Sequence, residues 1–195
     1  FDIDQVFVAD GEEGLVNEAD DNLTNSILGG TRGAKFTENP DSSLNGNFIA
    51  GSQASPQNFG NINTGNNQSA SVTLNYDGDS DVNLDTSIGF APIDVTENNN
   101  NLGFLFENDS DDTGSLIVRL FSDSGNNASE AQGTITADTN NIFLEFANNF
   151  STIAGSGVDF KNVTAAQIEL STSGSIAVDA VGFAQSSSDT IPDPD

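Results

Sequence analysis

The chain has 195 residues, which is enough for one domain with a hydrophobic core and leaves little room for two. It carries 30 Asp and Glu residues against 4 Lys and Arg residues, so its formal net charge is -26. A surface this acidic repels nucleic acid and anionic membranes, which argues against both as partners.

The missing residue types exclude several kinds of chemistry. The chain has no Cys, His, Met or Trp. Without Cys and His, the Ser-His and Cys-His nucleophile systems and the usual zinc and copper ligand sets cannot form. No apolar run reaches the roughly 18 residues of a membrane span. The acidic composition favours a saline or calcium-bearing extracellular environment, because clustered acids need a cation or an open loop.

Apolar and polar residues alternate with the period of two that is typical of strands, and no useful length shows a helical period. In chain order, strands are predicted near residues 5–9, 32–38, 46–52, 70–76, 100–107, 115–122, 133–138, 141–147, 165–172 and 175–183. Clusters of Gly, Asn, Asp and Ser between them are typical of turns. This pattern predicts an all-β fold, an antiparallel two-sheet sandwich or jelly roll of about ten strands.

Two pairs of consecutive strands are predicted to form hairpins. One is TADTNNIFLEF, with DTNN as its loop, and the other is LSTSGSIAV, with Ser173 and Gly174 in its turn. The stretch 53–68 has the composition of a loop. We expect a single sandwich domain over residues 1–184 and an acidic, proline-containing tail over residues 185–195.

Two of the predicted strands carry apolar residues on both faces. For the strand at 115–122 this predicts a central position that is covered on both sides. The strand within residues 1–10 could pair in its own sheet or in that of a neighbouring subunit. Its candidate interface residues are Phe1, Ile3, Phe7 and Val8.

Five segments in a fixed order carry a family resemblance: SILGGTRGAKF, SASVTLNYDGD, GSLIVRLFSD, GVDFKNVTAAQIELS and SIAVDAVGF. Together they resemble secreted bacterial surface proteins, common in cyanobacteria, that carry a C-terminal exosortase-type (PEP-CTERM-like) sorting signal. That signal begins Pro-Glu-Pro, and here Pro192, Asp193 and Pro194 stand in its place. The resemblance covers roughly residues 1–184. It implies an extracellular or cell-surface jelly-roll-like domain, cleavage near the sorting signal on export, and no catalytic mechanism.

The first candidate metal site is the acidic loop NYDGDSDVNLD. It contains Asp77, Asp79, Asp81 and Asp85. Alternating carboxylates bring several hard oxygen ligands within reach of one ion, which suits Ca²⁺. Asp and Gly are also favoured in ordinary solvated turns, so a purely structural loop is the alternative.

Two further acidic positions are candidate calcium ligands. The loop ENDSDDTG offers a similar set of carboxylates: Glu107, Asp109, Asp111 and Asp112. In the last predicted strand Asp179 stands among apolar residues, where burial would require a partner or a metal. Asp2 or Asp4 could then join it. The alternative is that Asp179 faces solvent.

Three functions are compatible with the sequence. The leading hypothesis is a non-enzymatic extracellular protein whose copies assemble into a surface filament, tubular pilus or sheath, strengthened by Ca²⁺ at the acidic loops. Its basis is the scarcity of catalytic residue types and the apolar two-sided strands, which permit strand addition between copies. The alternative is a monomeric calcium-dependent module that binds carbohydrate, such as extracellular polysaccharide, or adheres. A glycoside-active enzyme is third, since no carboxylate pair stands out.

Overall fold

The computed structural model of the chain describes residues 6–9, 13–17, 31–38, 47–50, 60–63, 69–79, 83–108, 110, 112–137, 141–174 and 176–188. These residues form strands, turns and bends and no helix, which confirms the all-β prediction. Within this described part, no helix could cross a membrane.

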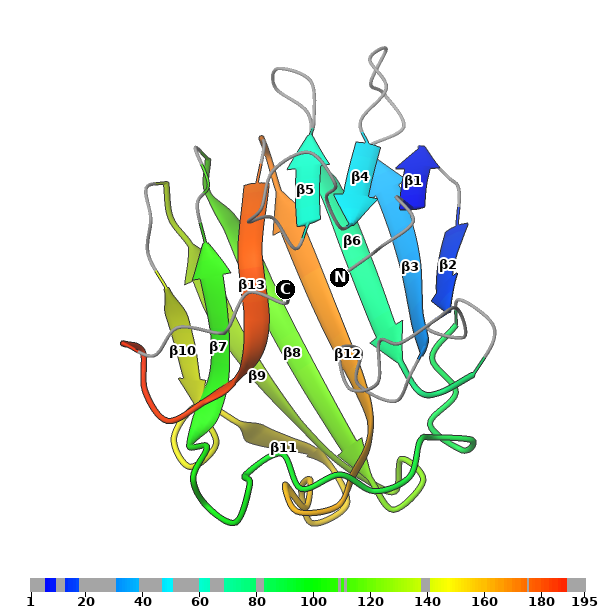
Figure 1. Cartoon of the computed structure of the whole chain (residues 1–195), viewed down its shortest axis with the longest axis vertical. Coiled ribbons are helices and arrows are strands. Elements are labelled where there is room, and N and C mark those ends of the chain that lie inside the picture. Colours follow the sequence, from blue (N-terminus) through cyan, green and yellow to red (C-terminus); the bar gives the residue numbers. More distant parts are fainter. Residues whose placement is uncertain are drawn as a thin grey trace.

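The strands form two antiparallel sheets that lie face to face (Figure 1). The first sheet has six strands in the order β1 (Val6–Ala9), β4 (Asn47–Ala50), β5 (Gly60–Asn63), β13 (Ile176–Ala184), β7 (Gly103–Asn108) and β10 (Ile142–Glu145). The second has seven strands in the order β11 (Ser151–Ala154), β9 (Asn127–Ile135), β8 (Gly114–Ser122), β12 (Val163–Thr172), β6 (Ala70–Tyr76), β3 (Thr31–Glu38) and β2 (Glu13–Asn17). The predicted two-sheet sandwich is therefore confirmed.

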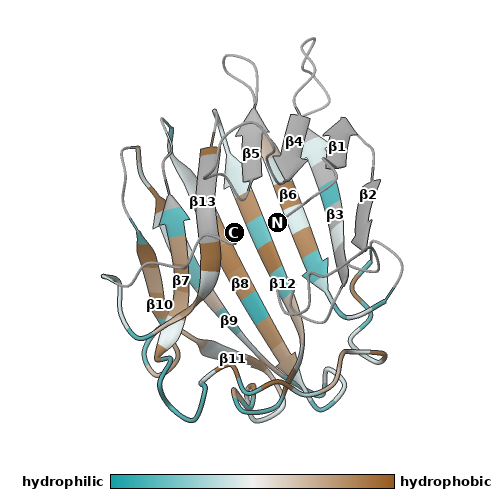
Figure 2. Ribbon diagram, viewed as in Figure 1, coloured by the Kyte–Doolittle hydropathy of each residue, from teal (hydrophilic) through white to brown (hydrophobic). Residues whose placement is uncertain are grey.

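The hydrophobic core lies between the two sheets. Along β8 buried and half-buried side chains alternate from Leu116, and β12 follows the same pattern except at Ala165 and Ala166, which are both buried. Figure 2 shows the alternation on β12 as apolar and polar bands. The seven-stranded sheet contributes Leu74, Leu116 and Leu120 to the core, and the six-stranded sheet contributes Phe106. Because side chains on a strand alternate between faces, the polar residues of these same strands point away from the core.

A group of phenylalanines packs against this core: Phe104, Phe146, Phe150, Phe160 and Phe183. The rings of Phe146 and Phe160 are closest, with their centroids 4.4 Å apart. The single tyrosine, Tyr76, is also buried. These aromatic side chains therefore extend the hydrophobic core.

Most strand predictions match the structure within a few residues. The strand expected at 133–138 lies earlier, because β9 spans Asn127–Ile135. Three strands were missed, namely β2, β5 and β11, and β5 lies within the stretch 53–68 that was predicted to be a loop. These three strands have only four or five residues each, too few for the alternation to stand out.

Both hairpin predictions were wrong. The strands of TADTNNIFLEF are β9 and β10, and the strands of LSTSGSIAV are β12 and β13. In each pair the first strand belongs to the seven-stranded sheet and the second to the six-stranded sheet. β12 is already flanked by β6 and β8, and β13 by β5 and β7, so neither has an open edge for the other. In both cases the chain therefore passes from one sheet to the other between consecutive strands.

Candidate functional site

The acidic loop after β6 is organised around a buried carboxylate. Asp77 is only 2% exposed, and its two oxygens accept hydrogen bonds from the backbone of the same loop. The N–H of Asp79 donates to Oδ1 at 3.0 Å and the N–H of Asp85 donates to Oδ2 at 2.6 Å. Asp85 in turn accepts bonds from Ser87, chiefly from its hydroxyl, and these lower the pKa of Asp85. The Asp77 carboxylate thus holds the loop closed by accepting hydrogen bonds from two backbone N–H groups.

Three of the other predicted metal ligands, Asp81, Asp109 and Asp111, lie outside the described residues. Asp179 lies in β13 at an irregularity in the pairing with β7, between Val178 and Ala180. Among the described residues, no three acidic side chains gather as a metal site. The calcium prediction stays a prediction.

The predicted intersubunit strand pairs within its own chain. β1 pairs with β4, with Phe7 opposite Ile49 and Val8 opposite Phe48. The other two interface candidates, Phe1 and Ile3, lie outside the described residues. The filament, like the sorting signal, stays a prediction.

A row of hydroxyl side chains crosses the outer face of the seven-stranded sheet. The strand register places five of them side by side on neighbouring strands β3, β6, β12, β8 and β9: Thr37, Ser71, Ser171, Ser115 and Thr134. Strands lie about 4.8 Å apart, so the row is roughly 19 Å long. In the described part of the chain, the hydroxyls of Ser71, Ser115, Ser171 and Thr134 make no hydrogen bond. They are available to a ligand.

The hydroxyl row lines an open hollow of about 710 Å³ at the end of the sheet. We call it the hydroxyl hollow; its lining residues are Thr37, Ser69, Ala70, Ser71, Thr113, Gly114, Ser115, Thr134, Ser171, Thr172 and Ser173. Nine of these eleven carry a hydroxyl group and none is ionisable. In a chain with a net charge of -26, a lining without charge is a distinctive local environment.

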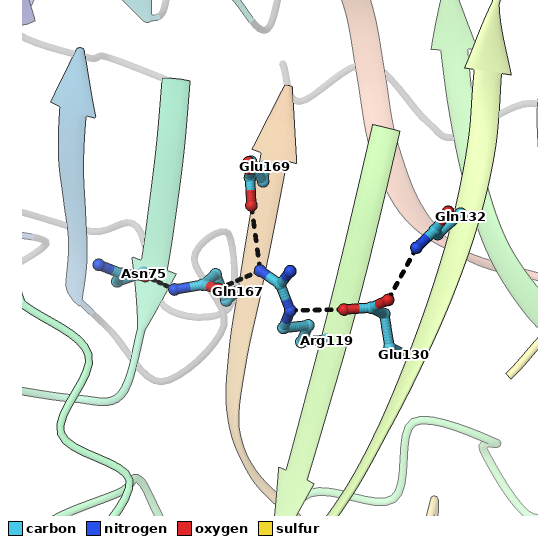
Figure 3. A network of polar contacts seen from close by, with 6 residues as sticks. All are labelled: Asn75, Arg119, Glu130, Gln132, Gln167 and Glu169. Atoms are coloured by element: carbon cyan, nitrogen blue, oxygen red, sulfur yellow. Dashed lines mark hydrogen bonds and ion pairs between the residues drawn. The ribbon is translucent and has the colours of Figure 1, made fainter. Parts of the chain in front are cut away.

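A second polar group lies on the same face, roughly 13 Å from the row, since Ser115 and Arg119 are four residues apart along β8. Figure 3 shows this group, which we call the Arg119 network: Asn75, Arg119, Glu130, Gln132, Gln167 and Glu169. Arg119 Nε donates to Glu130 Oε2 at 2.7 Å, and its Nη1 donates to Gln167 Oε1 at 2.6 Å and to Glu169 Oε2 at 3.1 Å. These bonds tie β9, β8 and β12 together.

Amide side chains extend the network at both ends. Gln167 Nε2 donates to Asn75 Oδ1 at 2.8 Å, and Gln132 Nε2 donates to Glu130 Oε1 at 2.9 Å. The hydrogen bond from Gln132 is the main cause that lowers the pKa of Glu130, with the hydrogen bond and charge of Arg119 adding to it. For Arg119, burial opposes the charge, but the bonds and charges of Glu169 and Glu130 prevail and raise its pKa. These contacts therefore favour the charged forms of Arg119 and Glu130.

Arg119 is not among the candidate site residues predicted from the sequence. The signal was available, because a lone arginine in the apolar run SLIVRLFS needs partners. The strand at 115–122 was predicted to be covered on both sides. Its outer face is only partly covered in the structure, because Ile117, Arg119 and Phe121 are all half-buried. β8 is nevertheless central, as predicted, since it pairs with both β9 and β12.

No family model matches the sequence, and no curated protein is significantly similar to it. One similar solved structure is the family 11 carbohydrate-binding module from Clostridium thermocellum in complex with a beta-1,3-1,4-mixed-linked tetrasaccharide. Its TM-score is 0.39 and its sequence identity is 12%, over 92% of this chain and 97% of that chain. TmCBM61 in complex with beta-1,4-galactotriose has a TM-score of 0.37 and 12% identity, over 78% of this chain and 88% of its own. The agarase AgWH50C has a TM-score of 0.40 and 11% identity, over 78% of this chain but only 24% of the agarase.

Proposed function

We propose that the chain is a non-enzymatic, cell-surface module that binds a polysaccharide in the hydroxyl hollow. The observation that carries this proposal is the row of Ser and Thr hydroxyls without internal partners, from Ser71 to Thr134, across neighbouring strands. Each hydroxyl can both donate and accept, as can the hydroxyls of a sugar. A sugar unit seated in the hollow would face hydroxyl groups of neighbouring strands, which lie about 4.8 Å apart.

The carboxylates on this face favour binding over catalysis. A glycosidase requires one carboxylic acid with a raised pKa to protonate the leaving oxygen. Here the pKa of Glu130 is lowered, first by Gln132 and then by Arg119, so Glu130 is held ionised. Glu169 is bound to the same guanidinium at 3.1 Å. Both carboxylates thus serve as partners of Arg119.

The proposal is tested by titrating the purified chain with mixed-linked beta-1,3-1,4-glucan, beta-1,4-galactan and agarose in a calorimeter. Micromolar to millimolar binding of at least one polysaccharide is expected. Ser71→Ala, Ser115→Ala and Ser171→Ala combined should weaken it strongly, because each lost hydrogen bond contributes about 0.5–1.5 kcal/mol.

The matched control is Ser151→Ala on the edge strand β11, which lies outside the hollow and is also exposed. It should leave the affinity unchanged. Equal losses in the triple variant and the control, or no binding of any polysaccharide by the wild type, would contradict the proposal.

A further inference from the structure

One donor group of the Arg119 network is left over on the outer face of the sheet. The guanidinium uses Nε for Glu130 and Nη1 for Gln167 and Glu169. Nη2 makes no hydrogen bond to any of the described residues, and Figure 3 shows it as the terminal nitrogen without a dashed line. The side chain is 24% exposed, so this nitrogen offers two N–H donors in a fixed position.

The two glutamates decide which acceptor suits these donors. One arginine with two carboxylates gives the network a local charge of -1, since its other members, Asn75, Gln132 and Gln167, are neutral. A ligand carboxylate or sulfate at Nη2 would come close to Glu130 and Glu169 and be repelled. An uncharged oxygen would gain the hydrogen bond without that repulsion.

We infer that Arg119 is a specificity-determining residue that donates from Nη2 to an uncharged oxygen of the ligand, while Glu130 and Glu169 exclude anionic chains. This inference rests on the proposed polysaccharide-binding function and names the ligand class, a neutral polysaccharide. Arg119 lies on β8, the strand that also carries Ser115 of the hydroxyl hollow. One extended chain that runs along β8 can therefore contact both.

The sharpest variant changes the charge and keeps the shape. Glu130→Gln and Glu169→Gln together retain side-chain oxygens that accept hydrogen bonds from Arg119 but change the local charge from -1 to +1. The chain as a whole stays strongly acidic, but at physiological salt charges beyond about 8 Å are screened. The charge beside Nη2 therefore decides the outcome.

The matched control is Glu97→Gln with Glu145→Gln. These glutamates lie outside the network, and their replacement changes the net charge by the same amount. Both double variants, Arg119→Lys and the wild type are titrated with mixed-linked beta-1,3-1,4-glucan, a neutral polymer, and with alginate, a polymer of uronic acids. Thermal unfolding confirms that each variant is folded.

We expect the wild type to bind the glucan and not alginate, and the Glu130 and Glu169 double variant to gain alginate binding at least tenfold, with an affinity that falls as salt is added. The control pair should gain none. Arg119→Lys should bind the glucan at least about tenfold more weakly, because lysine keeps the charge but lacks the guanidinium fork.

Two contrary results separate the inference from the proposed function. Glucan binding that is unaffected by Arg119→Lys, with no alginate binding by the Glu130 and Glu169 variant, overturns the inference and leaves the proposed function in place. Failure of the wild type to bind any neutral polysaccharide overturns the proposed function. If the Glu130 and Glu169 double variant gains alginate binding in that case, the result still supports the inference that these two glutamates exclude anionic chains.

Discussion

The two faces of the seven-stranded sheet differ sharply although the same strands form both. On β8 the inner face carries Leu116, Val118 and Leu120, which are at most 1% exposed. The outer face carries Ser115, which is exposed, and Arg119, which is half-buried. The inner face excludes water and stabilises the fold through apolar burial. The outer face contributes little to packing, so its side chains are free to serve binding.

The largest effect expected from the inner face is at Phe106. Its side chain is fully buried between the sheets, so Phe106→Ala removes apolar contacts and leaves a cavity. We expect the free energy of unfolding to fall by about 3–5 kcal/mol, measured by chemical denaturation. A loss below about 1 kcal/mol would show that the core collapses around the gap and that the inner face is loosely packed.

Overpacking of the inner face should also destabilise the fold. A Cβ added at Gly133 of β9 would lie 2.7 Å from Ile142 Cγ2 of β10, in the opposite sheet. Gly133→Val should therefore lower the free energy of unfolding by about 1–3 kcal/mol. Thr134→Val, one residue on and on the outer face, is the control and should be close to neutral in the same denaturation experiment.

The loop after β6 provides a test that also bears on calcium. Asp77→Asn replaces one acceptor oxygen by an NH₂ group that would face a backbone N–H, that of Asp79 or Asp85. A loss of about 1–3 kcal/mol is expected from the unsatisfied group. Because the lost bond is to the backbone, the loss should be the same in EDTA and in calcium chloride.

The melting temperature of the wild type in the same two buffers tests the predicted calcium site. Calcium binding to the folded state would raise it with calcium concentration. A loss in Asp77→Asn that appears only with calcium present would assign Asp77 to an ion instead of to the backbone.

On the outer face, acid should weaken the Arg119 network. The folded-state pKa of Glu130 lies below its ordinary value of 4.5. Its contribution to stability is therefore complete above pH 4.5 and is lost as the pH falls through the lower, folded-state value. Glu130→Gln should flatten the stability profile below pH 4.5. The exposed Glu97→Gln is the control, and an identical flattening there would contradict the assignment to Glu130.

The smallest effect on stability is expected in the hydroxyl hollow. Ser115 is exposed and makes no side-chain hydrogen bond in the described part of the chain. Ser115→Ala should change the free energy of unfolding by less than about 0.5 kcal/mol. A loss comparable to that of Phe106→Ala would mean that the outer face is part of the folding core, and the contrast between the two faces would disappear.

The sequence by itself determined the fold class, most of the strands and the central place of β8, because a period of two is a local property that neighbouring residues express directly. The predicted calcium ligands and the predicted intersubunit interface stay predictions.

Only the tertiary structure decided which strands pair. β9 and β10, and likewise β12 and β13, are consecutive yet lie in different sheets, and β9, β12 and β13 each have another strand on both sides. The same long-range register aligns Ser71, Ser171 and Ser115 in one row and brings Gln167 and Glu130 to Arg119. A functional surface made of one residue from each of several strands has no local signature, since it exists only once the strands are in register.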